Sequence, residues 1–217
     1  MPQKAGSKNA FSSWSGGKDS CLALYVAERA GHRVDFLLNM LTADGTYSRS
    51  HGLRPAMLQR QAEAMGREIV FGRADWDGYE KAFSERLAFL KSKGVGTGVF
   101  GDIDLADHRD WVERVCAAAG LAAVLPLWGK GREELLENFF SSGFQAVIVS
   151  VKESAMGAEW LGRMLDRAAV EEFRETGIDI CGEGGEYHTF VYDGPTFRHP
   201  VSWSLGPVKR VDRKSVV

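Results

Sequence analysis

The sequence contains few cysteines and no long apolar run. Its 217 residues include three cysteines, Cys21, Cys116 and Cys181, which are far apart and form no CxxC pair. This argues against a disulfide framework and against a zinc knuckle. The first residues, MPQKAGSKNA, contain no apolar segment, so a signal peptide is not expected. No stretch approaches the roughly 18 apolar residues that cross a membrane. We therefore expect a cytoplasmic protein with no membrane partner.

An excess of basic residues is also missing. The chain has 27 Lys and Arg residues against 29 Asp and Glu residues, with a net charge of −2 and a pI near 6.2. Non-specific binding to nucleic acid or anionic lipid requires a basic surface, so we expect no nucleic-acid partner. Hydrophobic residues make up 44% and charged residues 26%, as in ordinary globular proteins.

Short apolar runs alternate with longer amphipathic stretches, a pattern typical of βαβ units. The expected strands of the first part are 9–14, 34–40, 68–72, 98–101 and 122–126. The expected helices between them are 19–30, 54–65, 79–90 and 106–119. The predicted fold class is therefore α/β, with a parallel, Rossmann-like sheet over residues 1–124.

The pattern changes after Pro126. Here we expect a helix at 132–142, a strand at 145–151, a helix at 159–175 and a strand at 188–192. These elements predict a smaller α+β domain over residues 125–205. The basic and apolar residues of 206–217 predict a tail.

The clearest motif is Ser15-Gly16-Gly17-Lys18-Asp19-Ser20, between the first expected strand and helix. Two glycines allow a sharp turn whose N–H groups, with the positive end of the helix, form an anion site. The serines add hydroxyl donors and Lys18 adds a charge, whereas Asp19 is suited to cap the helix or hold magnesium. A plain Gly-Gly turn before a capped helix is the alternative, but the order of the six residues favours phosphate binding.

A second candidate segment is the glycine-rich run from Gly182 to Pro195. Its glycines permit positive φ and close ligand approach, and Glu183 and Glu186 add two carboxylates. Such a pair is suited to recognise a cationic group or ammonium, or to act as a general base. Tyr187 offers a cation–π contact. The alternative is a glycine-rich hairpin whose glutamates are solvated.

These motifs resemble the diphthine–ammonia ligase family. SGGKDS is similar to the PP-loop of the N-type ATP pyrophosphatases, which split ATP into AMP and pyrophosphate to adenylate a substrate. Further similar segments are His51-Gly52 with Leu58, Gln61, Ala62 and Gly66, then Pro126-Leu127-Trp128-Gly129, and Gly182–Pro195. The resemblance implies an adenine nucleotide alpha hydrolase-like ATP-binding domain at 1–124 and a substrate-binding domain at 125–205. It also implies an ATP-dependent ligase that forms an amide.

The resemblance implies roles for individual residues. The implied catalytic residues are Lys18, Asp19 and Glu186, with Asp19 also a magnesium ligand. The implied ATP-binding residues are Ser15, Gly16, Gly17, Lys18, Asp19, Ser20, Asn39, Met40, Leu41 and His51. The implied substrate-binding residues are Gly101, Asp102, Arg109, Glu183, Gly184, Gly185, Glu186 and Tyr187. The chain departs from the family near Arg109, because Trp111 stands where we expect a second arginine.

The implied cofactors are ATP and Mg²⁺, and the implied partners are free ammonia and a carboxylate, diphthine on translation elongation factor 2. One alternative is a PP-loop ATP pyrophosphatase with another small-molecule or RNA substrate. The absence of a CxxC pair and of a basic face argues against tRNA thiolation. Another alternative is a module that binds ATP without turning it over. The sequence leaves the oligomeric state open, a homodimer included.

Overall fold

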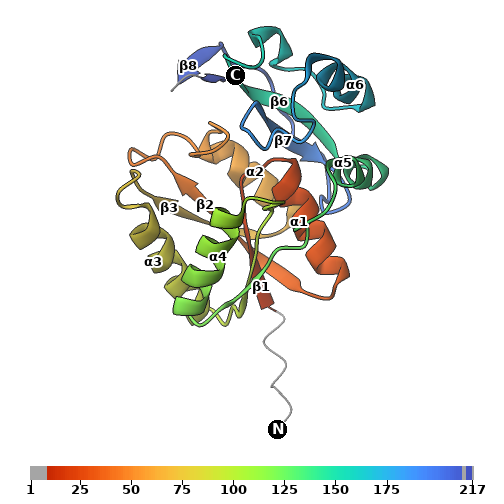
Figure 1. Ribbon diagram of the computed structural model, residues 1–217. Helices are drawn as coiled ribbons and strands as arrows, with labels where there is room; N and C mark the ends of the chain where they lie inside the picture. Colours follow the sequence, from red (N-terminus) through yellow and green to blue (C-terminus); the bar gives the residue numbers. More distant parts are fainter. Residues whose placement is uncertain (1–8, 212–213, 217) are drawn as a thin grey trace.

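The computed structural model describes residues 9–211 and 214–216. Its first part is a five-stranded parallel sheet in the order β3-β2-β1-β4-β5 (Figure 1). The strands are β1 (Asn9–Ser13), β2 (Arg33–Leu41), β3 (Glu68–Arg73), β4 (Thr97–Val99) and β5 (Ala122–Val124). The predicted α/β fold class is confirmed. The order reverses direction between β1 and β4, and ligands of such sheets bind beyond the carboxyl ends of the strands at that point.

Helices cover both faces of this sheet. They are α1 (Lys18–Arg29), α2 (Pro55–Met65), α3 (Tyr79–Ser92) and α4 (Ala106–Ala118). Apolar residues of α1 and α2 pack in one core cluster, and those of α3 and α4 pack in another. Helix α2 starts at Pro55 and ends where Gly66 adopts φ 67°, because glycine enters this left-handed conformation without strain.

The second part is a four-stranded antiparallel sheet in the order β7-β6-β9-β8, which lies above the first sheet in Figure 1. Its strands are β6 (Gln145–Lys152), β7 (Tyr187–Asp193), β8 (Lys209–Val211) and β9 (Lys214–Val216). Its helical elements are α5 (Arg132–Ser141), the short η1 (Ala158–Trp160) and α6 (Arg167–Thr176).

Two expectations differ from the structure here. The helix predicted at 159–175 is wrong in its first half, where Gly162 adopts φ 83° and Asp166 caps α6 by accepting a hydrogen bond from the Ala169 N–H. The segment predicted as a tail, 206–217, contains the β8 and β9 strands. Those strands complete the second sheet. The apolar core of this second part is continuous with the core that α1 and α2 form on one face of the first sheet.

Strand β7 joins the two parts of the molecule directly. The Val191 N–H donates to the Gly16 carbonyl at 2.9 Å, and the Lys18 N–H donates to Thr189 Oγ1 at 3.0 Å. Gln61 of α2 donates from Nε2 to both the Gly16 carbonyl (2.9 Å) and the Val191 carbonyl (2.6 Å). The SGGKDS segment is thus held between its own sheet and β7.

Candidate functional site

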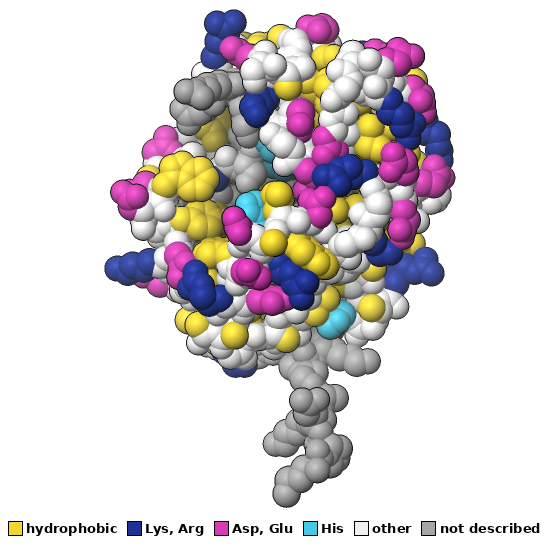
Figure 2. Space-filling view, viewed as in Figure 1, with side chains coloured by type: hydrophobic (Ala, Val, Ile, Leu, Met, Phe, Trp, Pro, Cys, Tyr) yellow, Lys and Arg dark blue, Asp and Glu magenta, His cyan; other side chains and the backbone are white. Residues whose placement is uncertain are grey.

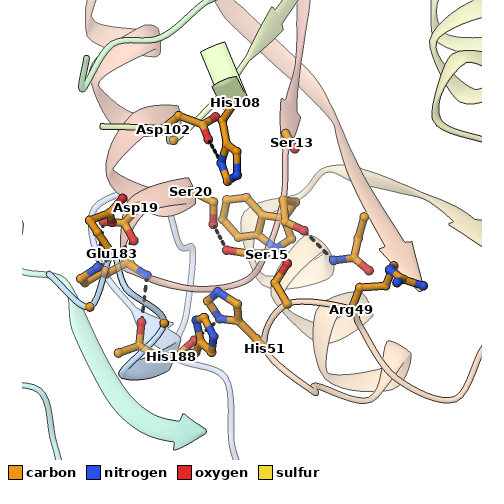
Figure 3. Close-up of a pocket in the computed structure, with 18 of the residues that line it drawn as sticks. Ser13, Ser15, Asp19, Ser20, Arg49, His51, Asp102, His108, Glu183 and His188 are labelled. Atoms are coloured by element: carbon orange, nitrogen blue, oxygen red, sulfur yellow. Dashed lines mark hydrogen bonds and ion pairs between the residues drawn. The ribbon is translucent and has the colours of Figure 1, made fainter. Parts of the chain in front are cut away.

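A cavity of about 270 Å³ opens where the two parts meet. Its walls come from the carboxyl ends of β1, β2 and β4, from the start of α1, and from residues 181–189. Histidine and acidic side chains gather around the hollow in the face shown in Figure 2. Figure 3 shows side chains from both parts of the molecule directed toward one another across it. The predicted phosphate motif and the predicted glycine-rich segment therefore share one cavity.

The SGGKDS segment forms a tight turn that continues into a helix. Gly16 adopts φ 82°, and a Cβ there would lie 2.7 Å from Gln61 Oε1, so the turn requires glycine. Ser15 Oγ and Ser20 Oγ are 3.1 Å apart and both residues line the cavity. Helix α1 begins at Lys18, so half of the motif is helical, and the helix N-terminus is directed at the cavity.

Two N–H groups of this turn already have protein partners. The Gly17 N–H donates to Ser15 Oγ at 3.3 Å, and the Lys18 N–H donates to Thr189 Oγ1. The sequence predicts that successive N–H groups of this turn face a phosphate, and these two face protein atoms instead. The Ser20 hydroxyl donates to the Gly17 carbonyl at 3.0 Å, so the Ser15 hydroxyl is the donor to Ser20 Oγ. The motif presents these two hydroxyl groups and the first turn of α1 to the cavity.

The Lys18 ammonium is directed toward the second part of the molecule. Its Nζ donates to Asp19 Oδ2 at 2.7 Å, to Asp19 Oδ1 at 3.0 Å, and to the Cys181 carbonyl. Burial, the largest single influence, lowers the pKa of Lys18, but Asp19, Tyr187 and Cys181 together outweigh burial and raise that pKa above its usual value. Lys18 therefore stays charged, in an ion pair with Asp19, whose side chain is partly exposed.

The β2 end of the cavity contains Asn39 and Met40, whereas Leu41 lies outside the lining. Asn39 Nδ2 donates to the Trp14 carbonyl at 2.7 Å. Because a carbonyl only accepts, this bond fixes which amide atom is oxygen. Asn39 Oδ1 is buried, and no hydrogen-bond partner for it exists among the residues that the structure describes.

The predicted His51 lines the cavity beside a residue that the sequence did not single out, His188. Their ring centroids are 4.6 Å apart (Figure 3). His51 Nδ1 donates to the Thr189 carbonyl at 2.8 Å, which leaves Nε2 as the other polar atom of its ring. A Cβ at Gly17 would strike the His51 ring, so the ring rests directly on the SGGKDS turn. The alternation of residues 188–192 indicates a strand. A strand pattern gives no reason to single out His188 as a residue that lines the cavity.

Arg49 is a second lining residue that sequence reasoning missed. Its guanidinium lies 4.0 Å from the ring centroid of Trp76 and 5.8 Å from that of Tyr79. Its Nη1 donates to the Ala74 carbonyl at 2.6 Å. A cation that is stacked on aromatic rings is pre-positioned at the cavity edge. A single arginine in a loop carries no sequence signal for this arrangement.

The predicted substrate residues are only partly brought together. Gly101, Asp102, Glu183, Gly185 and Tyr187 line the cavity. Gly184, Glu186 and Arg109 do not; Arg109 pairs with Glu113 at 2.8 Å on the surface of α4. At Gly101 a Cβ would lie 2.9 Å from the Asp19 backbone, so this wall position requires glycine.

The two glutamates of the glycine-rich segment have different surroundings. Glu183 lies beside Asp19 at the cavity (Figure 3), and burial, then the nearby Asp19 charge, raises its pKa to about 7. Glu186 folds back over Gly184 instead, and its Oε2 is buried with no hydrogen-bond partner among the described residues. Glu183 is therefore the carboxylate of this segment that a ligand in the cavity meets.

Residues 9–211 and 214–216 contain no group of three or more His, Cys, Asp and Glu side chains that could hold a metal ion. Both Asp19 oxygens accept hydrogen bonds from Lys18. The magnesium role expected for Asp19 stays a prediction, in which one carboxylate and the phosphates of ATP would hold the ion. Burial raises the pKa of the Cys181 thiol to about 12, so this cysteine is not a nucleophile at neutral pH. Within the described part of the chain, no helix is long and apolar enough to cross a membrane.

Comparison with known proteins gives matches along most of the chain. Residues 8–123 match the family described as "Diphthamide synthase N-terminal domain", and residues 131–206 match "Diphthamide synthase C-terminal domain". The human protein "Diphthine--ammonia ligase" is 32% identical over 216 residues, covering 86% of this chain and 79% of the human protein. The protein of the same description from Danio rerio is 32% identical, covering 86% of this chain and 83% of its own length.

A longer relative with that description, from Schizosaccharomyces pombe, is 30% identical over 85% of this chain and 34% of its own length. Among solved structures, a chain described as a predicted subunit of tRNA methyltransferase from Methanocaldococcus jannaschii aligns with a TM-score of 0.45 and 17% identity. That alignment covers 84% of this chain and 96% of the other.

Proposed function

The chain belongs to the diphthine–ammonia ligase family, and we propose that it uses ATP to convert a substrate carboxylate into an amide with ammonia. One observation carries the proposal: Ser15 and Ser20 of the phosphate motif line the same cavity as Glu183 of the family's C-terminal segment. A ligase of this kind must hold the acyl group and the α-phosphorus of ATP within contact distance, so the two segments have to share a cavity.

The reaction has two steps. A carboxylate oxygen attacks the α-phosphorus of ATP, the bond from that phosphorus to the β-phosphate breaks, and pyrophosphate leaves. Ammonia then attacks the acyl carbon, a carbon–nitrogen bond forms, and AMP leaves with the original carboxylate oxygen while a proton is released. The protein forms no covalent bond to substrate in this scheme; it positions the reactants and stabilises charge.

We assign the phosphates to the start of α1, where the helix N-terminus supplies positive potential. The Ser20 hydroxyl, which donates to the Gly17 carbonyl, and the Ser15 hydroxyl, which bonds to Ser20 Oγ, turn to the phosphates when ATP binds. His51 packs on the same turn and lines the cavity, and we place it against the nucleotide. We assign the base to the space beyond the carboxyl end of β2, where Asn39 and Met40, the last lining residues of that strand, face the cavity. Magnesium would arrive with ATP on its phosphates, and Asp19, which lines the cavity, is the carboxylate that would hold it there.

The acyl substrate in this proposal is diphthine on translation elongation factor 2, in the cytoplasm. Diphthine carries a trimethylammonium group, and the Glu183 carboxylate at the cavity is suited to a cation. Tyr187, which we had expected to contact that group, is buried and donates its hydroxyl to the Ile180 carbonyl at 2.6 Å. Residues 1–124 then bind ATP and residues 125–205 bind the acyl substrate.

The test combines the purified protein with ATP, magnesium, an ammonium salt and diphthine-bearing elongation factor 2. We expect AMP and pyrophosphate in amounts equal to the amide, which mass spectrometry detects on the factor. Ser20→Ala should slow pyrophosphate release by about tenfold or more, because it removes a hydroxyl that turns from the Gly17 carbonyl to the phosphates. Ser141→Ala, on the exposed end of α5, is the matched control and should not change the rate.

The other outcomes separate the remaining possibilities. Pyrophosphate released only with a different carboxylate would retain the ligase and refute diphthine as its substrate. Binding of ATP without AMP formation for any carboxylate would identify a non-catalytic ATP-binding module.

A further inference from the structure

The side chain of Lys18 is almost completely removed from solvent, with 6% of its surface exposed. A lysine that binds a phosphate must extend its ammonium to the ligand, as a flexible point charge. An ammonium has three N–H donors. Here the partners of Nζ are the two oxygens of Asp19 and the Cys181 carbonyl. The cation is thus directed across the boundary between the two parts of the molecule, from the start of α1 to residue 181.

The segment that Lys18 reaches is a compact turn. The Gly182 N–H donates to the Asp179 carbonyl at 2.8 Å, and the Gly185 N–H donates to the Gly182 carbonyl at 2.9 Å. Gly182 and Gly185 adopt φ 71° and 75°, which allows the chain to reverse within these few residues. Glu183 lies inside this turn, so the position of the turn sets the position of its carboxylate in the cavity.

Two side chains hold consecutive carbonyl groups at the beginning of the turn. Tyr187 Oη donates to the Ile180 carbonyl at 2.6 Å, and Lys18 Nζ donates to the Cys181 carbonyl. The ammonium also lies 5.6 Å from the centroid of the Tyr187 ring, which adds a cation–π attraction. Charge-assisted hydrogen bonds of this kind are stronger than neutral ones, and a buried cation that loses a partner is costly. Displacing the turn therefore breaks strong contacts.

We infer that Lys18 is a positioning residue: its ammonium anchors the Cys181 carbonyl and thereby fixes the Gly182–Gly185 turn, with Glu183, against the phosphate motif. The inference rests on the proposed ligase function only for what Glu183 does once it is in place. It differs from the role that the sequence suggested, a direct contact between Lys18 and a phosphate oxygen. It also explains why the motif has a lysine whose charge is matched by its own neighbour, Asp19.

The test compares Lys18→Met with the parent protein and with Lys130→Met, which removes an exposed lysine from an i, i+4 pair with Glu134. Methionine keeps an unbranched chain of similar length and removes the ammonium. The readouts are the dissociation constant for magnesium-bound ATP, the amide hydrogen exchange of residues 179–186, and the kcat and KM for ATP in amide formation.

For Lys18→Met we expect exchange in residues 179–186 to accelerate by about tenfold or more, since a strong anchor is lost. We expect the ATP dissociation constant and KM to stay within about threefold of the parent, while kcat for amide formation falls by at least about tenfold. Lys130→Met should match the parent in every readout. An ATP dissociation constant raised about a hundredfold, with unchanged exchange in the turn, would mean that Lys18 is a phosphate ligand and would overturn the inference.

Tyr187→Phe is the second variant, because Lys18→Met leaves the Asp19 carboxylate without its cation and can impair folding. It removes the companion hydrogen bond and leaves the phosphate motif intact, so faster exchange in residues 179–186 with unchanged ATP affinity is expected again. Unchanged exchange and kcat in folded Tyr187→Phe would contradict an anchored turn. The exchange and ATP-binding results do not depend on the acyl substrate. A parent protein that forms no amide refutes the proposed function and leaves this inference to be decided by the exchange data.

Discussion

Replacing Glu183 by glutamine is expected to stabilise the protein at alkaline pH and to leave its stability unchanged at acid pH. Burial and the nearby Asp19 charge raise the pKa of Glu183 from 4.5 to about 7 in the folded protein. A carboxyl group whose pKa is higher in the folded state binds its proton more tightly there than in the unfolded chain. Folding is therefore opposed once the group must ionise, from about pH 4.5 upward, and the opposition is complete above about pH 7.

The size of the effect follows from the same values. A change of one pKa unit corresponds to about 1.4 kcal/mol, so a pKa of about 7 instead of 4.5 corresponds to about 3 kcal/mol. Glu183 is partly accessible at the cavity, and solvent screening reduces this to about 1.5 kcal/mol. Lys18 lowers the pKa of Glu183, whereas Asp19, Asp104 and Asp179 raise it, so those charges must be kept intact in the comparison.

The assay is urea unfolding of the parent and Glu183→Gln at pH values of about 4 and about 9. The two proteins should agree at the lower pH, and the variant should be more stable by about 1.5 kcal/mol at the higher pH. Glu85→Gln, on the exposed face of α3, controls for the loss of one negative charge and should show no such difference. Equal stability of parent and Glu183→Gln at both pH values would refute the argument that burial and neighbouring negative charges raise the pKa of Glu183.

Three further predictions concern the residues around the phosphate motif and α6. Gly17→Ala should weaken ATP binding by about tenfold or more, measured by titration calorimetry, because the new methyl group strikes the His51 ring; unchanged affinity would mean that the ring moves freely. Gln61→Leu should lower the free energy of unfolding by about 3 kcal/mol in urea, since it leaves Trp14 Nε1 and the Gly16 and Val191 carbonyls without this partner; a loss under about 1 kcal/mol would contradict this. Asp166→Ala should cost about 1 kcal/mol by the same assay through loss of the α6 cap, whereas Asp166→Asn should retain most of the stability.

Local sequence signals account for most of the first sheet and its helices. Pro55 and Gly66 bracket α2 because one fixes φ for a helix start and the other allows the left-handed end. The same reasoning placed one helix over 159–175, where apolar spacing outweighed Gly162 and Asp166. In the structure Gly162 adopts positive φ and Asp166 caps a helix that begins later. These two residues therefore set the start of the helix, and the apolar periodicity before them does not. The β8 and β9 strands gave no signal, since short strands gain their order from pairing with neighbours: β9 pairs with β6, and β8 pairs with β9.

The site was predictable where its chemistry lies in one segment and not where it depends on distant partners. Ser15–Ser20 is recognisable from its order alone, and the structure places four of its residues, Ser15, Lys18, Asp19 and Ser20, in the cavity wall. The direction of the Lys18 side chain depends on a carbonyl 163 residues away, which no local pattern encodes. Glu183 and Glu186 look alike in the sequence, yet the φ 75° of Gly185 between them sends the chain in a new direction, and one carboxylate reaches the cavity while the other does not.

The bonds that β7 makes to the Gly16–Lys18 turn bear on the order in which the protein matures. The Lys18 N–H and Thr189 Oγ1 are separated by 171 residues, and Gln61 and the Val191 carbonyl by 130. Contacts of such long sequence separation form late, because a large loop must close before they contribute. During synthesis, residues 9–124 can assemble their sheet while residues 189–191 are still inside the ribosome. The cavity is then incomplete until the second sheet docks, so under the proposed function we expect ATP to be engaged only by a chain whose second part is already folded.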